Sequence, residues 1–108
     1  MNDTFKLFKN YKIEKTKIKG RTYKLWVANT PQKRKLGLSK VRQLPQGYGM
    51  IFCFNELVDN SFTMKNTKIP LTIIFLDESF GIVDYFSCRP FSKKSIRPQK
   101  PYKYVIEI

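Results

Sequence analysis

The chain has 108 residues, of which 42% are hydrophobic and 27% charged, and its formal net charge at pH 7 is +13. A chain of this length has room for one domain around one core, and its apolar content is sufficient for a folded protein. The sequence contains no histidine, which excludes Ser-His-Asp and Cys-His catalytic groups and the H-E-x-x-H metal site. It also lacks a run of about 18 apolar residues, so no membrane insertion is expected.

The positive charge is unevenly distributed. Residues 1–47 carry thirteen Lys or Arg against two acids, residues 48–88 two against five, and residues 89–108 six against one. Two basic segments therefore flank a weakly acidic centre, a pattern that indicates an acidic partner such as nucleic acid. The candidate polyanion-binding residues are Lys6, Lys9, Lys12, Lys33, Arg34, Lys35, Lys93, Lys94 and Arg97.

We expect residues 1–22 to form a basic N-terminal arm with a first strand, and residues 23–108 to form a single β-sandwich domain. In the arm, Phe5, Phe8 and Tyr11 are each followed by a lysine. Such rings can stack on the bases of a single strand while the lysines neutralise phosphates. We favour the alternative, in which the rings pack on the domain. The arm has no signal-peptide features, so a cytoplasmic location is expected.

Lysines alternate along the first predicted strand, residues 14–19, which turns at Gly20. Alternating lysines are typical of an edge strand, because they oppose pairing with a second sheet. Residues 23–28 alternate between apolar and other side chains, which predicts a second strand. A helix of one or two turns follows, beginning at Pro31 and ending at Gly37.

Four more strands are predicted, over residues 50–54, 71–76, 82–86 and 102–108. Residues 71–76 are apolar on both faces, so we expect this strand at the centre of a sheet. The last strand is expected to direct one set of side chains to a single face, namely Tyr102, Tyr104, Ile106 and Ile108. Many short strands with one short helix predict a mainly β fold, either a β-sandwich or a closed barrel.

The cysteines and acids offer little for catalysis. Cys53 lies between two phenylalanines and is expected to be buried, whereas Cys88 precedes Arg89, which would favour its thiolate. An enzymatic interpretation would need Cys88 or a carboxylate to act without a histidine, which we do not favour. We therefore expect no catalytic residue, no metal and no cofactor.

Residues 64–67 read Met-Lys-Asn-Thr and allow two interpretations. The side chains of Asn66 and Thr67 can hydrogen-bond to neighbouring backbone at a strand end, which we favour. The alternative is a ligand pocket in which Arg42 and Asn66 orient a polar group. The candidate pocket residues are Arg42, Met50, Met64, Asn66 and Thr67.

In combination, these motifs resemble the family DUF192, a domain of unknown function. The resemblance covers nearly the whole chain from about residue 23, and it implies a jelly-roll-like sandwich without implying an activity. The residues that match the family pattern are Gly37, Leu38, Arg42, Leu44, Gly49, Met50, Phe52, Phe54, Phe62, Met64, Lys65, Asn66, Thr67, Ile69, Pro70, Leu71, Ile73, Phe75, Asp77 and Glu107.

The chain departs from this pattern at three positions. Ser39 stands where the family usually has methionine, Thr63 where it has tryptophan, and Thr72 where it has aspartate. Relatives continue beyond the closing L-E-L with a glycine turn and a strand, whereas this sequence stops at Ile108. If the family builds a pocket from the tryptophan and the aspartate, we expect that pocket to be altered here.

We therefore expect a non-catalytic module that acts by binding or as a structural component. The alternative is binding of nucleic acid or another polyanion through the two basic segments. Convergence of these segments on one face would favour the alternative. A cleft shared by Cys88 and an acid would favour an enzyme.

Overall fold

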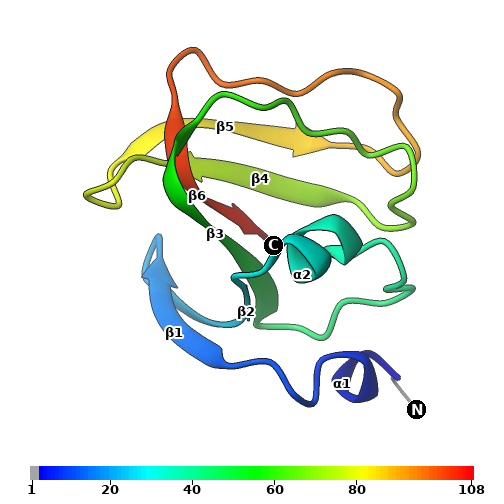
Figure 1. The fold of residues 1–108 in the computed structure, drawn as a ribbon. Coiled ribbons are helices and arrows are strands. Elements are labelled where there is room, and N and C mark those ends of the chain that lie inside the picture. The colour runs from blue at the N-terminus through cyan, green and yellow to red at the C-terminus, as the bar shows by residue number, and fades with distance from the viewer. Residues whose placement is uncertain (1–2) are drawn as a thin grey trace.

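The structure is a computed structural model, and it describes residues 3–108. The fold is mainly β, as predicted, but it has two short helices where one was expected. Neither helix in the described part of the chain is long and apolar enough to cross a membrane. In chain order the elements are α1 (Thr4–Leu7), β1 (Ile13–Ile18), β2 (Arg21–Ala28), α2 (Pro31–Leu36), β3 (Tyr48–Val58), β4 (Leu71–Leu76), β5 (Ile82–Cys88) and β6 (Tyr102–Glu107) (Figure 1).

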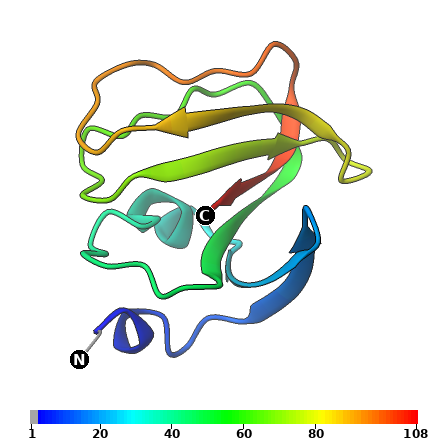
Figure 2. The same cartoon turned by 180° about the vertical axis from the view of Figure 1, so that it is seen from behind.

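All six strands belong to one curved sheet with the order β1-β2-β3-β6-β4-β5 (Figures 1 and 2). Neighbouring strands are antiparallel except β2 and β3. The sheet is not closed into a barrel, since β1 and β5 are its two edges. The Nζ atom of Lys19, just after β1, lies 5.8 Å from the ring centroid of Tyr85 on β5. The finer prediction of a jelly-roll-like sandwich or a closed barrel is therefore not confirmed.

The parallel pairing of β2 and β3 depends on α2, because parallel neighbours need a crossover connection. Thr30 caps the helix by accepting a hydrogen bond from the backbone N–H of Lys33 at 3.1 Å, and Pro31 follows the cap. Gly37 ends the helix with a φ of 50°, in a conformation that favours glycine. A Cβ on Gly37 would lie 3.3 Å from the ring of Phe52, so the absence of a side chain also brings the helix end close to β3.

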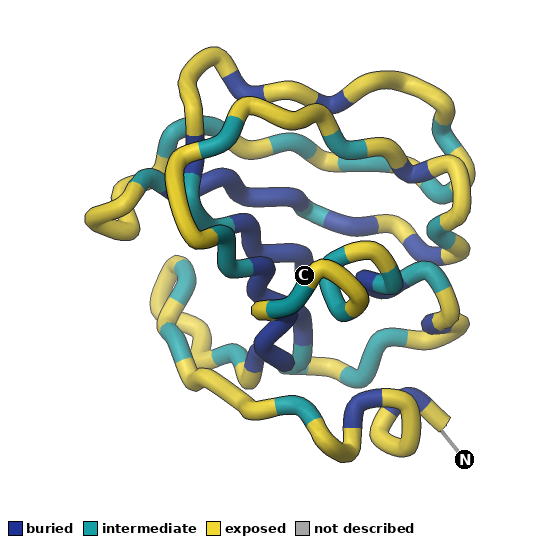
Figure 3. Tube along the Cα trace, viewed as in Figure 1, coloured by how far each residue is buried: buried dark blue, intermediate teal, exposed yellow. Residues whose placement is uncertain are grey.

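One face of the sheet carries the main core, which we define by the buried side chains around Trp26, Phe52, Phe75 and Val105. In Figure 3 the buried segments lie mostly along the strands at the centre of the sheet, and the exposed segments surround them. Strand β4 pairs with β6 on one side and with β5 on the other, so the predicted central strand is confirmed. The opposite face of the sheet carries a second, smaller apolar cluster.

Tyr102 does not share a face with the other residues predicted to accompany it. It packs in the main core, while Tyr104 and Ile106 contact the smaller cluster on the opposite face. The cause is a shift in the pairing of β6 with β3, between the positions of Cys53 and Val58. The Tyr102 hydroxyl donates a 2.6 Å hydrogen bond to the carbonyl of Asn60, which satisfies the polar end of this buried ring. The prediction for Tyr102 is wrong for this reason.

Candidate functional site

A small cavity of about 190 Å³ lies where the end of α2, residues 62–67 and the end of β6 meet. We call it the Glu107 pocket. It is lined by Arg34, Lys35, Leu36, Gly37, Leu38, Ser39, Phe52, Phe62, Thr63, Asn66, Thr67 and Glu107.

Glu107 is the unusual group in this pocket. Its exposed fraction is 6%, and the structure shows no hydrogen bond or ion pair to its carboxyl group within residues 3–108. Burial raises the pKa of Glu107 to about 8. The carboxyl group is therefore protonated at neutral pH, and it can donate one hydrogen bond as well as accept others.

The position of Glu107 follows from the pairing of β6 with both central neighbours. It lies opposite Met50 on β3 and Ile73 on β4, and both of these are fully buried. A Cβ on Gly49 would collide with the backbone carbonyl of Glu107 and with the side chain of Ile108. Glycine at position 49 thus allows β3 and β6 to approach closely enough to fix Glu107.

The opposite wall comes from residues 62–67. Phe62 exchanges two 2.8 Å backbone hydrogen bonds with Ile96, and the N–H of Thr67 donates to the carbonyl of Met64 at 2.9 Å. The side chain that bonds to neighbouring backbone is that of Thr63, which accepts from the N–H of Lys65 at 3.3 Å. The segment is therefore held by its backbone and by Thr63. No side-chain hydrogen bond of Asn66 or Thr67 is seen in the described structure.

The structure brings together two of the five predicted pocket residues. Asn66 and Thr67 line the Glu107 pocket. Arg42 is exposed and does not line it, and Met50 and Met64 are buried in the main core. Glu107 was therefore not predicted as a site residue, although Glu107 matches the family pattern. The available signal was an acid between Ile106 and Ile108 in an otherwise apolar strand end.

Arg34 lines the Glu107 pocket but is held by other contacts. Its Nη1 donates a 2.9 Å hydrogen bond to the carbonyl of Cys53, and its guanidinium lies 5.0 Å from the ring centroid of Phe54. Lys33 similarly lies 4.7 Å from the ring centroid of Tyr11. Of the predicted polyanion-binding residues on α2, Lys35 is the most exposed.

The other predicted polyanion-binding residues lie in two separate places. Lys6, Lys9 and Lys12 lie in or after α1, at one end of the molecule, while residues 93–97 belong to the long connection at the opposite end (Figures 1 and 2). Arg97 forms an ion pair with Asp59 at 3.2 Å. The two basic segments therefore do not converge on one face.

The aromatic side chains of the arm pack on the domain. Phe8 is 2% exposed, and its ring lies 4.8 Å from that of Trp26 and 4.9 Å from that of Tyr11. Phe5 is about half exposed and meets the rings of Trp26 and Tyr48 edge-on. Phe8 is thus part of the main core and is not available to stack on a base.

The two thiols are poorly suited to nucleophilic attack. Burial raises the pKa of Cys88, and Glu107 raises it further once its own carboxyl group ionises above pH 8; both effects are opposite to that expected from Arg89. Burial also raises the pKa of Cys53. Both side chains are therefore less ionised near neutral pH than an exposed cysteine.

A sequence profile of DUF192, described as an uncharacterized ACR, matches residues 13–108. The chain belongs to the DUF192 family. A comparison of this chain with curated proteins found no match. The structure of a protein from Sinorhizobium meliloti, described as a "putative transcription regulator", is similar with a TM-score of 0.77 and 31% identity, over 91% of this chain and 81% of that one. A protein of unknown function from Novosphingobium aromaticivorans is similar with a TM-score of 0.78 and 28% identity, over 89% and 70% of the two chains.

The DUF192 pattern is concentrated around the Glu107 pocket. Seven of the twelve lining residues match it, namely Gly37, Leu38, Phe52, Phe62, Asn66, Thr67 and Glu107. Two more lining residues, Ser39 and Thr63, occupy positions where this chain departs from the pattern. Matches at buried positions such as Phe52 also serve packing, but Asn66 is exposed and makes no side-chain hydrogen bond in the described structure.

Proposed function

We propose that this DUF192 protein is a non-catalytic binding module whose Glu107 pocket takes a small neutral ligand that both donates and accepts hydrogen bonds, such as a sugar or a carboxamide. The observation that carries the proposal is the buried, protonated carboxyl group of Glu107 at a pocket that also exposes Asn66 and Thr67. No protein group within residues 3–108 is hydrogen-bonded to this carboxyl group, so a ligand in the pocket would supply hydrogen bonds that the protein does not.

The chemistry of the pocket favours a neutral ligand. Protonated Glu107, the amide of Asn66 and the hydroxyl of Thr67 each offer both a donor and an acceptor. The two cations of the lining select an anion only weakly, because Arg34 is held by the carbonyl of Cys53 and Lys35 is exposed to solvent. The rings of Phe52 and Phe62 add an apolar wall, as is usual in small-molecule sites.

The departures from the DUF192 pattern support a polar ligand. Ser39 and Thr63 are both smaller and more polar than the methionine and tryptophan that they replace. Ser39 donates a 2.7 Å hydrogen bond from its hydroxyl to the carbonyl of Leu36, which leaves its oxygen free to accept another. The pocket of this chain is therefore wider and carries more hydroxyl groups than one built with the family's usual residues.

Binding can be tested by NMR with a panel of neutral monosaccharides, polyols and small carboxamides at millimolar concentration. We expect at least one to shift the backbone and side-chain amide signals of residues 63–67. The double substitution Asn66→Ala, Thr67→Ala should weaken that ligand at least about tenfold, because each lost hydrogen bond contributes roughly 1 kcal/mol. Lys65→Ala, in the same segment but outside the lining, is the matched control and should change the affinity less than about twofold.

The pH dependence of this binding provides a second check. Affinity should fall above pH 8, where Glu107 loses the proton that it donates to the ligand. The proposal is wrong if no panel member shifts residues 63–67, or if Lys65→Ala weakens binding as much as the double substitution does.

Polyanion binding is the second candidate function. It is supported by the net charge of +13 and by the exposed lysines of the arm, and the description of the Sinorhizobium meliloti structure points in the same direction. The arm and residues 93–97 lie at opposite ends, so each would contact phosphates independently. Neutralising about three phosphates through the arm would give a log-log salt slope near −2 on single strands.

Fluorescence anisotropy with a labelled single-stranded oligonucleotide across a salt series tests this second candidate. We expect weak, sequence-tolerant binding at low salt that is lost when Lys6, Lys9 and Lys12 are all changed to Ala. The matched control changes Lys93 and Lys94 to Ala, at the other end of the molecule. Undetectable binding at tens of micromolar protein in 50 mM salt would rule polyanion binding out.

A further inference from the structure

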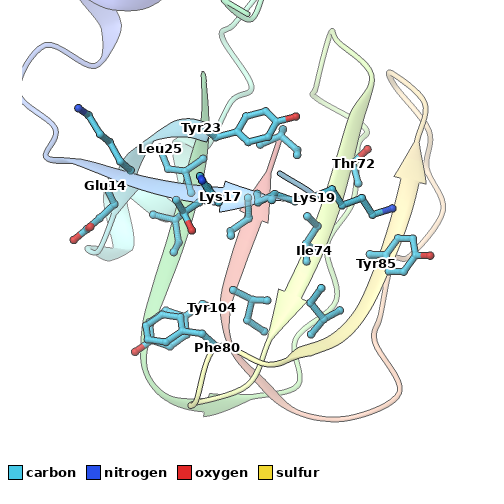
Figure 4. A pocket seen from close by; sticks show the side chains of 18 of the residues that line it. Glu14, Lys17, Lys19, Tyr23, Leu25, Thr72, Ile74, Phe80, Tyr85 and Tyr104 are labelled. Atoms are coloured by element: carbon cyan, nitrogen blue, oxygen red, sulfur yellow. The ribbon is translucent and has the colours of Figure 1, made fainter. Parts of the chain in front are cut away.

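The face of the sheet opposite the main core encloses a second and larger cavity, of about 860 Å³ (Figure 4). We call it the sheet cavity, and it shares no lining residue with the Glu107 pocket. Its volume falls within the roughly 300–1,000 Å³ typical of small-molecule sites. The buried part of its wall is entirely apolar and consists of Leu25, Val27, Ile51, Ile74, Leu76 and Ile106.

The curvature of the sheet explains why this cavity exists. The apolar wall comes from the four central strands β2, β3, β6 and β4, and the edge strands β1 and β5 bend toward each other on either side of it. Phe80 and Tyr104 stack at 4.3 Å between ring centroids and limit the cavity at one end. The result is an elongated apolar space that is open between β1 and β5.

A lysine borders the open side. Lys19, just after β1, is exposed and lines the cavity, and Glu14 is the one acid among its lining residues. Figure 4 shows Lys19 extending across the opening toward Tyr85 on β5, where its Nζ lies 5.8 Å from the ring centroid. Lys15 and Lys17 pair with Lys24 and Thr22 of β2, so they lie on the other face of β1 from Glu14, Thr16 and Ile18. The cavity thus combines an apolar interior with a cation at its opening.

We propose that the sheet cavity binds a free fatty-acid anion, with its acyl chain along the apolar wall and its carboxylate at Lys19. The apolar wall favours a chain of methylene groups, because each buried methylene contributes to affinity. Lys19 favours an anionic end group at the opening and disfavours a cationic one. A nucleic acid would contact the exposed lysines of β1 but would not use the apolar wall.

The sheet cavity is a property of this chain more than of its family pattern. None of its lining residues is among the matches to DUF192, in contrast to those of the Glu107 pocket. Thr72 lines the cavity at the position where the family usually has an aspartate. A carboxylate at this position would repel an anion, so its replacement by threonine suits the proposed ligand.

Isothermal titration calorimetry with laurate, below its critical micelle concentration, tests the proposal directly. Laurate should bind with a stoichiometry near one, and each methylene removed from the chain should weaken binding about fourfold. Dodecyltrimethylammonium has the same chain length with the opposite charge and should bind at least about tenfold more weakly. A neutral alcohol of equal length should lie between them.

Four variants test the assignment to this cavity. Lys19→Glu should weaken laurate at least about tenfold, and Thr72→Asp should weaken it by a similar factor. Lys24→Glu makes a single charge reversal on the neighbouring strand β2, at an exposed residue outside the lining, and should change affinity less than about threefold. Asn66→Ala, in the Glu107 pocket, should leave laurate binding unchanged.

Cys53 offers an independent readout, because it lines the sheet cavity. In a Cys88→Ser background, laurate should slow the labelling of Cys53 by a small thiol reagent. Several results would overturn the proposal: no laurate binding, equal affinity for laurate and dodecyltrimethylammonium, or equal losses from Lys24→Glu and from Lys19→Glu. If sedimentation shows a dimer and Cys53 is protected from labelling without laurate, the cavity is occupied by a second copy. Binding to anionic vesicles without binding of monomeric laurate would assign the cavity to a membrane surface.

Discussion

The protein is expected to lose stability as the pH rises from about 4.5 to about 8, because of Glu107. In the folded state burial raises the pKa of this carboxyl group to about 8, whereas in the unfolded chain it is near the ordinary value of 4.5. Between these values the folded state holds a proton that the unfolded state has released, so unfolding becomes easier as the pH increases. The free energy of unfolding should fall by roughly 1 kcal/mol for each pH unit over this window.

Urea denaturation of the wild type and of Glu107→Gln at pH 5, 6.5 and 8 measures this effect. Glutamine has nearly the same shape and cannot ionise, so the variant should lack this part of the pH dependence and gain stability relative to the wild type as the pH rises. Glu78→Gln, at an exposed turn position, is the matched control and should follow the wild-type curve. If the Glu107→Gln and wild-type curves run parallel, Glu107 is ionised in the folded protein and the Glu107 pocket has a different electrostatic character.

Replacing Phe75 with alanine should lower the free energy of unfolding by about 3–5 kcal/mol. Phe75 is fully buried on the central strand β4, and its ring meets those of Phe62, Phe86 and Tyr102 edge-on at centroid distances of 5.6, 6.0 and 4.8 Å. Removing the ring loses its transfer free energy and leaves a cavity among aromatic neighbours that are held by backbone pairing. A loss of this size is a large part of the stability of a small domain.

Thermal and urea unfolding of Phe75→Ala, compared with Ile82→Ala, would measure the difference between the core and the edge. Ile82 lies on the adjacent strand β5 and is 66% exposed, so its replacement should cost less than about 1 kcal/mol. A similarly small loss for Phe75→Ala would place β4 outside the core and contradict the assignment of the central strand.

Local sequence patterns predicted most of the elements. Apolar side chains on both faces of residues 71–76 identified β4 as a buried strand in the interior of the sheet, and five of its six side chains are indeed buried. Pro31 and Gly37 similarly marked the two ends of α2. These predictions succeeded because the physical cause of each element lies within a few neighbouring residues.

The arrangement of the strands could not be obtained in the same way. The curvature of a single sheet, and the fact that it stays open between β1 and β5, depend on pairings between residues far apart in sequence. The wrong face for Tyr102 has the same origin, because a pairing irregularity with β3 breaks the simple alternation on β6. Alternation along one strand carries no information about such an irregularity.

The candidate sites show the same limit. Asn66 and Thr67 were predicted from the sequence as pocket residues. Glu107, which lines the same pocket, lies about forty positions away in the sequence, and it comes close to them only through the pairing of β6 with β3 and β4. The lysines of β1 were predicted as protection for an edge strand, and they do lie on an edge. The place of Lys19 at the rim of the sheet cavity required the curvature of the whole sheet.

The position of β6 in the sheet has a consequence for the order in which the protein folds. Strands β1, β2 and β3 pair with one another, and β4 pairs with β5, but the two groups are joined only where β6 lies between β3 and β4. Before β6 enters, the chain consists of two partial sheets with no hydrogen-bonded connection and with the main core divided between them. Closing such distant contacts is slow compared with forming a hairpin. A nascent chain therefore exposes two unpaired inner strand edges, on β3 and β4, until its last strand is available, and this is the stage at which a chaperone or an aggregating neighbour would compete with β6.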